Sequence, residues 1–417
     1  MKPHKVIVIG GGPAGMMATI TAANNLKYEI ILIEKNTTLA RKMSITGGGR
    51  CNITNTCDVP TLLQKVQRNP RFLYSALNTF TSNTLLDILS IQGLKTKVED
   101  NGRVFPVSNK SGDVIGAFKK YLQKDNIQVM LGTTVLSIKK QSEKFVVVTN
   151  KHDQSLLADK IILCTGGLSA PATGSTGCGY NFAKQFGHRL TSEFFPSVVP
   201  LTIKESFVKE LQGTSLKDIG VTMYLNNKQI FKDVGDMIFT HFGVSGPVML
   251  RASAHIAKRL STNPIIFVDM FPNTSLKEFD EKLLHMLKNN ANKNIKTVLE
   301  EILQTKLAQV LLSSTNIKED IKSHSITKDE RLTIVDFIKN LKLTVMGNVG
   351  FNSAIATAGG IVTKEINPST MESKIIPNLY FTSELIDVNA YTGGYNLQIA
   401  FSTGYVAGLN ASKSIVN

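Results

Sequence analysis

Three glycines with a fixed spacing, Gly10, Gly12 and Gly15, follow an apolar stretch of strand length. In a strand–turn–helix unit the first glycine allows the tight turn, the second lets a pyrophosphate approach the backbone, and the third lets the helix pack close to the sheet. Pro13 suits the first helical turn, where its missing N–H costs little. From Ala14 onward, free N–H groups and the helix dipole would face the phosphates. The pattern predicts a dinucleotide site.

An acid stands where such a unit contacts ribose. A second apolar stretch, residues 29–33, ends on Glu34, nineteen residues past Gly15. A carboxylate there can accept hydrogen bonds from both ribose hydroxyls and disfavours a 2′-phosphate, which favours FAD or NAD over NADP. We include the neighbouring Lys35 among the cofactor contacts. A glycine-rich turn that binds nothing is the alternative, but it does not explain why three glycines and an acid coincide.

A second glycine cluster follows, because residues 46–52 read Thr-Gly-Gly-Gly-Arg-Cys-Asn. Consecutive glycines let the backbone approach a flat ring or a phosphate closely. The basic ends of the loop could hold the diphosphate or the electron-rich edge of a reduced flavin, and a flexible surface loop is the alternative. The predicted cofactor contacts in this region are Lys42, Gly48, Gly49, Arg50, Cys51 and Asn52.

Residues 160–167 read Lys-Ile-Ile-Leu-Cys-Thr-Gly-Gly, and their apolar run is typical of a strand in a parallel sheet covered on both faces. It ends in Thr165, Gly166 and Gly167, which would lie at the carboxyl edge of that sheet, where ligands bind. Val135 belongs to an earlier predicted strand, and its backbone could contact an adenine. We therefore add these four residues to the cofactor contacts.

In the last part of the chain, an apolar stretch is again followed by acids and glycines. A predicted strand at residues 378–382 leads to Glu384 and Asp387, whose carboxylates could hold ribityl hydroxyls. A glycine-started helix follows and could point its positive end at the flavin edge where negative charge grows on reduction. The predicted contacts at the helix start are Gly394, Tyr395, Asn396 and Leu397.

No residue stands out as a catalytic acid, and the candidates are His241, Cys51 and Tyr391. A hydrogen-bonding role within its loop is the alternative for His241. Five residues separate Cys51 from Cys57, whereas flavin disulfide reductases use C-x4-C, so we expect packed thiols. The four cysteines form no C-x-x-C pair and no zinc spacing, which predicts no metal site and fits a reducing cytoplasm.

Composition sets further limits. A chain of 417 residues suggests two or three domains, and a hydrophobic share of 42% allows a large core. The net charge is +15, but the lysines are spread along the chain, so we expect a small-molecule substrate and no nucleic acid. Residues 6–23 are uncharged, yet glycines and a proline interrupt them, so we expect neither a signal peptide nor a membrane span but a cytoplasmic protein. The sequence makes no prediction about oligomeric state.

These motifs resemble a known family, the BaiN/RdsA-type NAD(P)/FAD-dependent oxidoreductases of bacteria, also called aminoacetone-oxidase-like. The matching stretches are residues 10–15, 46–52, 102–106, 165–179, 240–247, 358–360, 370–374 and 387–408. Two positions depart from the family pattern. Ser383 precedes Glu384 where the family usually has glycine, and Asn389 replaces a usual acid, so the substrate could differ from that of relatives.

The resemblance implies an α/β protein that binds extended FAD in a discontinuous Rossmann-like domain, with a β-barrel and helices inserted in the middle. We place the FAD-binding domain at residues 1–190 and 346–417. The barrel-like domain would take residues 191–274 and 341–345, and a helical subdomain residues 275–340.

The predicted function is FAD-dependent hydride transfer between flavin and either NAD(P)H or a small organic substrate. Only one nucleotide fingerprint is present, so NADH or NADPH would bind transiently over the flavin. Reduction of an unsaturated or carbonyl compound and oxidation of a small amine both remain open. The alternatives are a flavin-dependent tRNA-modifying enzyme, motivated by the charge, and a non-enzymatic flavin redox sensor.

Overall fold

The computed structural model describes residues 3–151, 155–256 and 263–413. Contacts divide the chain into two compact units. The larger unit comprises Met1–Pro196 and Ala354–Asn417, and the inserted unit comprises Ser197–Ser353. Each unit has its own hydrophobic core. The three-part division expected from the sequence stays a prediction.

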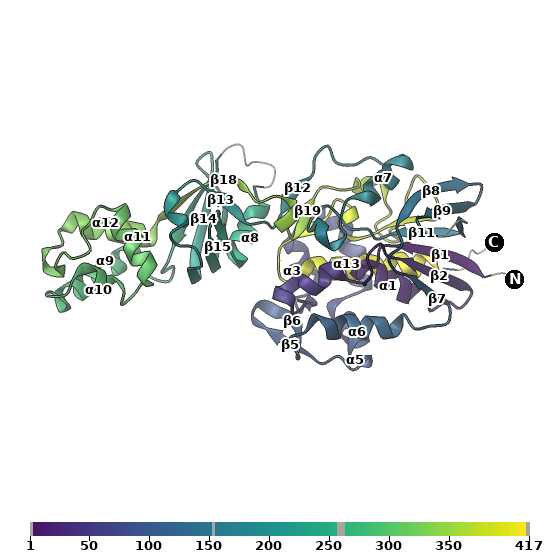
Figure 1. Cartoon of the computed structure of the whole chain (residues 1–417), viewed down its shortest axis with the longest axis horizontal. Coiled ribbons are helices and arrows are strands. Elements are labelled where there is room, and N and C mark those ends of the chain that lie inside the picture. Colours follow the sequence, from purple (N-terminus) through teal and green to yellow (C-terminus); the bar gives the residue numbers. More distant parts are fainter. Residues whose placement is uncertain (1–2, 152–154, 257–262, 414–417) are drawn as a thin grey trace. The chain divides into compact units, whose positions relative to one another are not determined.

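The larger unit is built on a five-stranded parallel sheet in the order β20-β11-β1-β2-β7 (Figure 1). Its strands are β1 (His4–Ile9), β2 (Tyr28–Ile33), β7 (Ile127–Met130), β11 (Lys160–Leu163) and β20 (Leu379–Phe381). All four residues of β11 are buried, as expected for a strand covered on both faces. Because β20 comes from the last part of the chain, both ends of the chain share one sheet.

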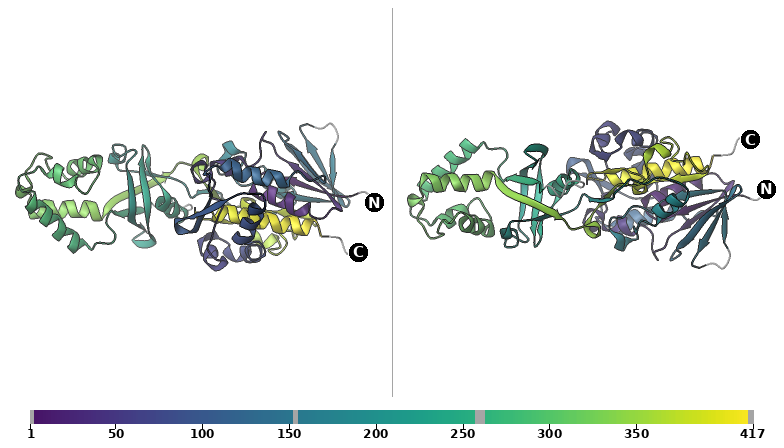
Figure 2. Two further views of the ribbon diagram at one scale, coloured as in Figure 1. Left: turned by 90° about the horizontal axis from the view of Figure 1, so that it is seen from below. Right: turned by 90° about the horizontal axis from the view of Figure 1, so that it is seen from above.

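Helix α1 (Pro13–Ala22) follows β1, and the C-terminal helix α13 (Tyr395–Ala411) lies alongside it, as all views show (Figures 1 and 2). Small residues allow this close packing. A Cβ on Gly404 would lie 2.3 Å from the carbonyl oxygen of Ala14, and a Cβ on Gly408 would lie 2.4 Å from that of Ala18. The absence of a side chain at these positions of α13 therefore allows the helix to pack directly against the backbone of α1.

The remaining helices and strands of this unit surround the sheet. They are α2 (Arg41–Ile45), β3 (Thr54–Asn55), α3 (Val59–Lys65), β4 (Val66–Arg68), α4 (Tyr74–Thr79), α5 (Ser82–Ile91), β5 (Thr96–Glu99), β6 (Arg103–Pro106), α6 (Ser111–Tyr121), β8 (Val135–Gln141), β9 (Lys144–Thr149), β10 (Leu156–Ala158), α7 (Cys178–Gln185), β12 (Phe195–Ser197), β19 (Ala356–Ala358) and β21 (Asn389–Ala390).

Local sequence patterns describe this unit incompletely in two places. Residues 60–92 carry helical apolar spacing and contain α3, α4 and α5, but β4 interrupts them and pairs antiparallel with β21. Strand β6, whose short glycine- and proline-bounded sequence is typical of a turn or an edge strand, is the central strand of a three-stranded sheet with β3 and β5. In both cases a partner distant in sequence supplies the strand pairing, and local periodicity does not report it.

The inserted unit contains a closed antiparallel barrel in the order β13-β16-β15-β14-β17-β18. Its strands are β13 (Leu201–Ile203), β14 (Ser215–Leu225), β15 (Lys228–Thr240), β16 (Gly243–Ser245), β17 (Ile265–Asp269) and β18 (Leu341–Asn348), with helix α8 (Pro247–Ala254) after β16. Strands β14 and β15 are longer than expected, and β16 lies inside a stretch expected to be a loop. The α/β fold class with a parallel sheet and an inserted barrel is confirmed.

Between β17 and β18 the chain forms four helices, α9 (Leu276–Asn289), α10 (Ile295–Leu299), α11 (Thr305–Ser314) and α12 (Lys328–Lys339). The Ser275 and Thr327 side chains begin α9 and α12 with complete capping boxes, as their sequences predict. Among the described residues, no helix is long and apolar enough to cross a membrane.

Candidate functional site

The turn between β1 and α1 contains glycines that the fold requires and one glycine that borders open space. Gly10 has a φ of 108°, and a Cβ on Gly15 would lie 1.8 Å from the Gly10 carbonyl oxygen, so both are required by the fold itself. A Cβ on Gly12 would meet nothing within 4 Å. Gly12 is the N-cap of α1 and makes no side-chain cap, so the N–H groups of the first turn, which also contains Pro13, face open space. The space beside Gly12 suits a phosphate.

Glu34 ties the end of β2 to this turn. One carboxylate oxygen accepts the Gly11 N–H at 2.7 Å, and the other accepts the backbone and side-chain N–H groups of Asn36 at 2.8 and 2.7 Å. The neighbouring Lys35 donates to the Thr176 hydroxyl at 2.9 Å. The Glu34 carbonyl accepts from the backbone N–H of Thr133 at 3.0 Å, which brings the chain before Val135 to this edge of the sheet.

The loop of residues 46–49 has a backbone that only glycine adopts readily. Gly47, Gly48 and Gly49 have φ values of 58°, 68° and 85°. A Cβ on Gly48 or Gly49 would meet no atom within 4 Å, so these two glycines border free space. Three consecutive left-handed residues expose their N–H groups in a way that suits an anion or a flat ring.

Two polar side chains fix the end of this loop. The Arg50 guanidinium binds Glu99 at 2.9 Å and lies 4.0 Å from the ring centroid of Phe105. The Asn52 amide, with its oxygen turned towards Gly394, accepts that backbone N–H at 3.0 Å. A Cβ on Gly394 would lie 2.3 Å from the Thr54 carbonyl oxygen. The glycine loop and the start of α13 are therefore in direct contact.

The turn after β11 lies beside the first glycine turn, because a Cβ on Gly10 would lie 3.2 Å from the Cα of Thr165. Among the described residues, the hydroxyl of Thr165 is buried and lacks a hydrogen-bond partner. Gly166 has a φ of 69°, and a Cβ on Gly167 would lie 2.5 Å from the Thr357 hydroxyl. The hydroxyl itself lies against Gly179 of α7, where a Cβ would approach it to 2.0 Å.

Lys42 and Glu384, predicted separately as cofactor contacts, bind each other. The Lys42 Nζ lies 2.8 Å from a Glu384 carboxylate oxygen and 2.8 Å from the Ser169 hydroxyl. Ser169 also donates to the same carboxylate oxygen at 3.2 Å. This cluster joins three segments far apart in sequence at the carboxyl edge of the parallel sheet. Ser169 was missed because nothing in its local sequence distinguishes it from a loop serine.

Asp387 has a partner that the sequence did not suggest. Arg68 of β4 binds its carboxylate with two nitrogens, one of them at 2.6 Å, and the Asn69 amide donates to it at 3.0 Å. The predicted contact of Asp387 with ribityl hydroxyls thus stays a prediction, on a carboxylate that is already paired. Pro70 was the available signal, because a proline inside an apparent helix marks a boundary.

The loop before α13 is held by the Asn396 side chain. Its amide oxygen accepts the Ala390 N–H at 2.9 Å, and its amide nitrogen donates to the carbonyls of Ala390 and Tyr391 at 2.8 and 3.2 Å. Tyr395 is buried and Leu397 is half-buried in the first turn of the helix. Asn396 therefore shapes the loop through its own hydrogen bonds, and direct contact with a cofactor is still a prediction for all three.

A family described as "HI0933-like protein Rossmann domain" matches residues 4–410, nearly the whole chain. The chain belongs to this family. The predicted resemblance is confirmed, because the relatives below carry the bile-acid reductase and rRNA dihydrouridine synthase activities from which the BaiN/RdsA type takes its name. The HI0933-like family consists of flavin-dependent oxidoreductases, so a flavoenzyme is shown and the non-enzymatic redox sensor is set aside.

Three relatives of the HI0933-like family align along their full length. A 3-dehydro-bile acid delta(4,6)-reductase from Clostridium scindens is 30% identical over 98% of this chain and 99% of its own. A ribosomal RNA dihydrouridine synthase from Haemophilus influenzae is 29% identical over 98% of both chains. The ribosomal RNA dihydrouridine synthase of Escherichia coli is 28% identical over 99% of this chain and 100% of its own.

Solved structures share the fold. The FrdA subunit of E. coli quinol fumarate reductase has a TM-score of 0.52 and 14% identity, covering 99% of this chain and 70% of its own. The 3-ketosteroid delta1-dehydrogenase of Sterolibacterium denitrificans has a TM-score of 0.51 and 11% identity, covering 99% of this chain and 100% of its own. At this identity the likeness supports the Rossmann FAD-binding fold alone.

The open spaces fit the FAD that the HI0933-like family implies. Gly12, Gly48 and Gly49 border space that no protein atom fills within 4 Å of an added Cβ. The turn at Gly12 would hold the diphosphate, and Glu34 the ribose. The individual contacts predicted from the sequence remain predictions. The described residues contain no group of three or more His, Cys, Asp or Glu that could hold a metal ion.

The three catalytic candidates lie in different surroundings. Cys51 is fully buried, and burial raises the pKa of its thiol to about 12. Such a thiol stays protonated at neutral pH, which argues against a role as nucleophile. His241 belongs to the inserted unit, where it is exposed in the turn between β15 and β16. Tyr391 lies in the loop before α13, where its backbone N–H donates to the Lys65 carbonyl at 3.1 Å.

We expect the cysteines to react in two classes. Burial raises the pKa of Cys51 and Cys164 to about 12 and also raises the pKa of Cys57, but Cys57 and Cys178 are only half-buried and can be reached from solvent. Because the thiolate is the reactive form and must also be reached, iodoacetamide at pH 8 should label Cys57 and Cys178 in the folded protein and the other two only after unfolding. Peptide mass spectrometry measures this directly. Rapid native labelling of Cys51 would contradict its buried position.

Proposed function

We propose that this protein is an FAD-dependent reductase that saturates a carbon–carbon double bond conjugated to a carbonyl group. The observation that carries the proposal is that relatives aligning with almost the whole chain are named for this chemistry. The first name describes reduction of double bonds that are conjugated to a ketone. Dihydrouridine is uridine whose C5=C6 bond, which is conjugated to a carbonyl, has gained two hydrogens. FAD, when bound, supplies the hydride chemistry. We propose NADH or NADPH, binding transiently, as the electron source.

Saturation of such a bond requires a hydride at one carbon and a proton at the other. Cys51 is a poor proton source because burial raises its pKa to about 12. Tyr391 is the candidate that remains in the larger unit, and its main chain is held by Lys65 and Asn396. We propose that Tyr391 gives the proton. The positive end of α13 would stabilise the negative charge that accompanies flavin reduction.

The distribution of charge favours RNA as the substrate. The larger unit contains 27 Lys and Arg against 16 Asp and Glu, a net charge of +11, whereas the inserted unit contains 20 against 16, a net charge of +4. Residues 35–124, which include the glycine loop, hold 14 Lys and Arg against 5 Asp and Glu. A basic surface around the reaction site favours a polyanion. We therefore propose a uracil of structured RNA, which replaces the expectation that nucleic acid is not a partner.

A second candidate is reduction of a small polycyclic enone. It is favoured by the bile-acid reductase, whose 30% identity slightly exceeds that of the two RNA-modifying relatives. This candidate would use the same reaction. It leaves the net charge of +11 on the larger unit without a function, because a small polycyclic enone does not need a basic surface.

One experiment separates these functions. The purified protein with FAD is titrated anaerobically with NADH and with NADPH, and then incubated with unmodified ribosomal RNA or with a 3-oxo-4-ene steroid. We expect one nicotinamide to bleach the flavin, and nucleoside mass spectrometry to detect dihydrouridine whose yield falls steeply with salt. Flavin reoxidation by the steroid alone would support the second candidate. Turnover of neither acceptor would overturn the proposal.

A further inference from the structure

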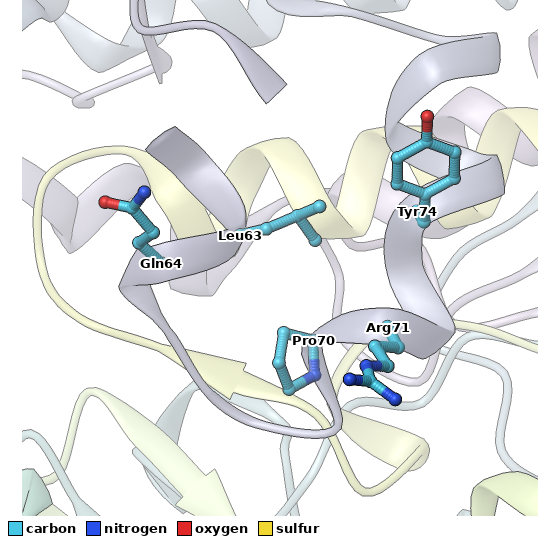
Figure 3. A pocket seen from close by; sticks show the side chains of 5 residues that line it. All are labelled: Leu63, Gln64, Pro70, Arg71 and Tyr74. Atoms are coloured by element: carbon cyan, nitrogen blue, oxygen red, sulfur yellow. The ribbon is translucent and has the colours of Figure 1, made fainter. Parts of the chain in front are cut away.

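A hollow of about 540 Å³ lies on the larger unit, outside the cofactor-binding turns (Figure 3). Its lining combines aliphatic, aromatic and basic side chains and consists of Leu63, Gln64, Pro70, Arg71 and Tyr74. In the close view, Leu63 points towards Tyr74, and Arg71 lies beside Pro70 (Figure 3). The ring of Tyr74 is 60% exposed, so it presents a face to solvent without a covering side chain.

The hollow is connected to the loop that precedes α13. Its walls come from the two ends of a segment whose middle is β4, and β4 pairs with β21 of that loop. The Lys65 carbonyl accepts the Tyr391 N–H at 3.1 Å, one residue from Gln64. Arg68, which lies two residues before Pro70 in the sequence, binds Asp387. A molecule in the hollow would therefore lie next to the β4–β21 strand pair, which also holds the loop that contains Tyr391.

The chain segment that lines the hollow carries only positive charges. From residue 59 to residue 86 the sequence contains Lys65, Arg68 and Arg71 and no Asp or Glu. Arg68 is neutralised by Asp387, whereas Arg71 is exposed and forms no ion pair within the described part of the chain. A cation next to an exposed aromatic ring and an aliphatic floor is the combination that binds single-stranded nucleotides, through the phosphate and the base respectively.

We propose that this hollow is a nucleotide subsite, which binds a residue of the RNA flanking the uridine that is reduced. The base stacks on Tyr74 and contacts Leu63 and Pro70, Gln64 is in reach of the base edge, and Arg71 binds the phosphate. The proposal rests on the proposed function, because it requires an RNA substrate. A small enone is disfavoured, because a site with its main ring 60% exposed cannot enclose most of an apolar ligand.

The test compares variants of these exposed residues in the full-length protein with FAD. Affinity for ribosomal RNA and for a short single-stranded RNA is measured by fluorescence anisotropy over a range of salt, and dihydrouridine by mass spectrometry. Tyr74→Ala should weaken binding about tenfold, because base stacking on an aromatic ring is lost, whereas Tyr74→Phe should bind like the wild type. Arg71→Ala should weaken binding and lower the salt slope by about one.

Controls distinguish the subsite from general effects. Lys184→Ala removes an exposed cation of α7, outside the basic stretch of residues 35–124, and Ile91→Ala removes an apolar side chain that is 76% exposed. Both should bind RNA within about twofold of the wild type. Flavin content, melting temperature and flavin reduction by the nicotinamide should be unchanged in every variant, because none of the substituted side chains is in the cofactor turns.

The possible failures are separate. If the wild type binds RNA and forms dihydrouridine but Tyr74→Ala and Arg71→Ala behave like Lys184→Ala, the subsite is wrong and the function stands. If the wild type neither binds RNA nor forms dihydrouridine, both proposals fall. If Tyr74→Ala changes only the oligomeric state measured by light scattering, the hollow binds a second copy of the chain and the subsite is overturned.

Discussion

Replacing Gly12 with alanine is expected to remove FAD binding while leaving the folded protein intact. Its φ of −78° and ψ of −174° are open to alanine, and a Cβ there meets no protein atom within 4 Å. The stability of the FAD-free protein should therefore change by less than about 0.5 kcal/mol. The added methyl group would occupy the space proposed for the pyrophosphate, and a clash of about 3 kcal/mol corresponds to about a 100-fold weaker affinity.

Gly15→Ala is the matched comparison, because it adds the same methyl group three residues away. Its Cβ would lie 1.8 Å from the Gly10 carbonyl oxygen, a backbone atom that cannot rotate away. We expect a loss of more than about 3 kcal/mol of stability even without FAD. Thermal melts of both variants, with and without added FAD, measure the difference. Normal FAD affinity in Gly12→Ala would show that the pyrophosphate does not bind at this turn.

Arg68→Met is expected to destabilise the larger unit and release FAD. It removes the guanidinium that binds Asp387, a residue only 5% exposed, and leaves that carboxylate with the hydrogen bond from the Asn69 amide but without its paired cation. Breaking a buried ion pair from one side costs about 3 kcal/mol, because the remaining charge is poorly solvated. The pairing of β4 with β21 should weaken with it, and this pairing holds the loop before α13.

Urea unfolding of the single variants and of the pair Arg68→Met with Asp387→Asn measures this coupling. The double variant should be more stable than the sum of the two single losses predicts, because it leaves no unpaired charge. Arg189→Met serves as the control, since its pair with Glu365 involves an arginine side chain that is 73% exposed and should contribute less than about 1 kcal/mol. Equal losses in Arg68→Met and Arg189→Met would contradict a buried role for the first pair.

Local sequence was sufficient for the nucleotide-binding half of this protein. The parallel strands β1, β2 and β11 each contain an uninterrupted apolar run, the glycines occupy positions where a turn or close packing requires them, and the capping residues mark the starts of α9 and α12. Each of these signals depends on neighbours within a few residues, so composition and spacing report them. The family resemblance followed from the same stretches.

Pairings between distant segments were decided only by the tertiary structure. Strand β4 reads as helix until β21 pairs with it, and Arg68 reads as a surface cation until Asp387, 319 residues away, binds it. The cluster of Lys42, Ser169 and Glu384 likewise joins three segments with no common local pattern. The hollow beside Tyr74 likewise takes its walls from both sides of β4. The sequence alone determined the FAD-binding unit and its turns, and the fold determined which charges are paired and which stay free to meet a substrate, because burial and ion pairing depend on partners far along the chain.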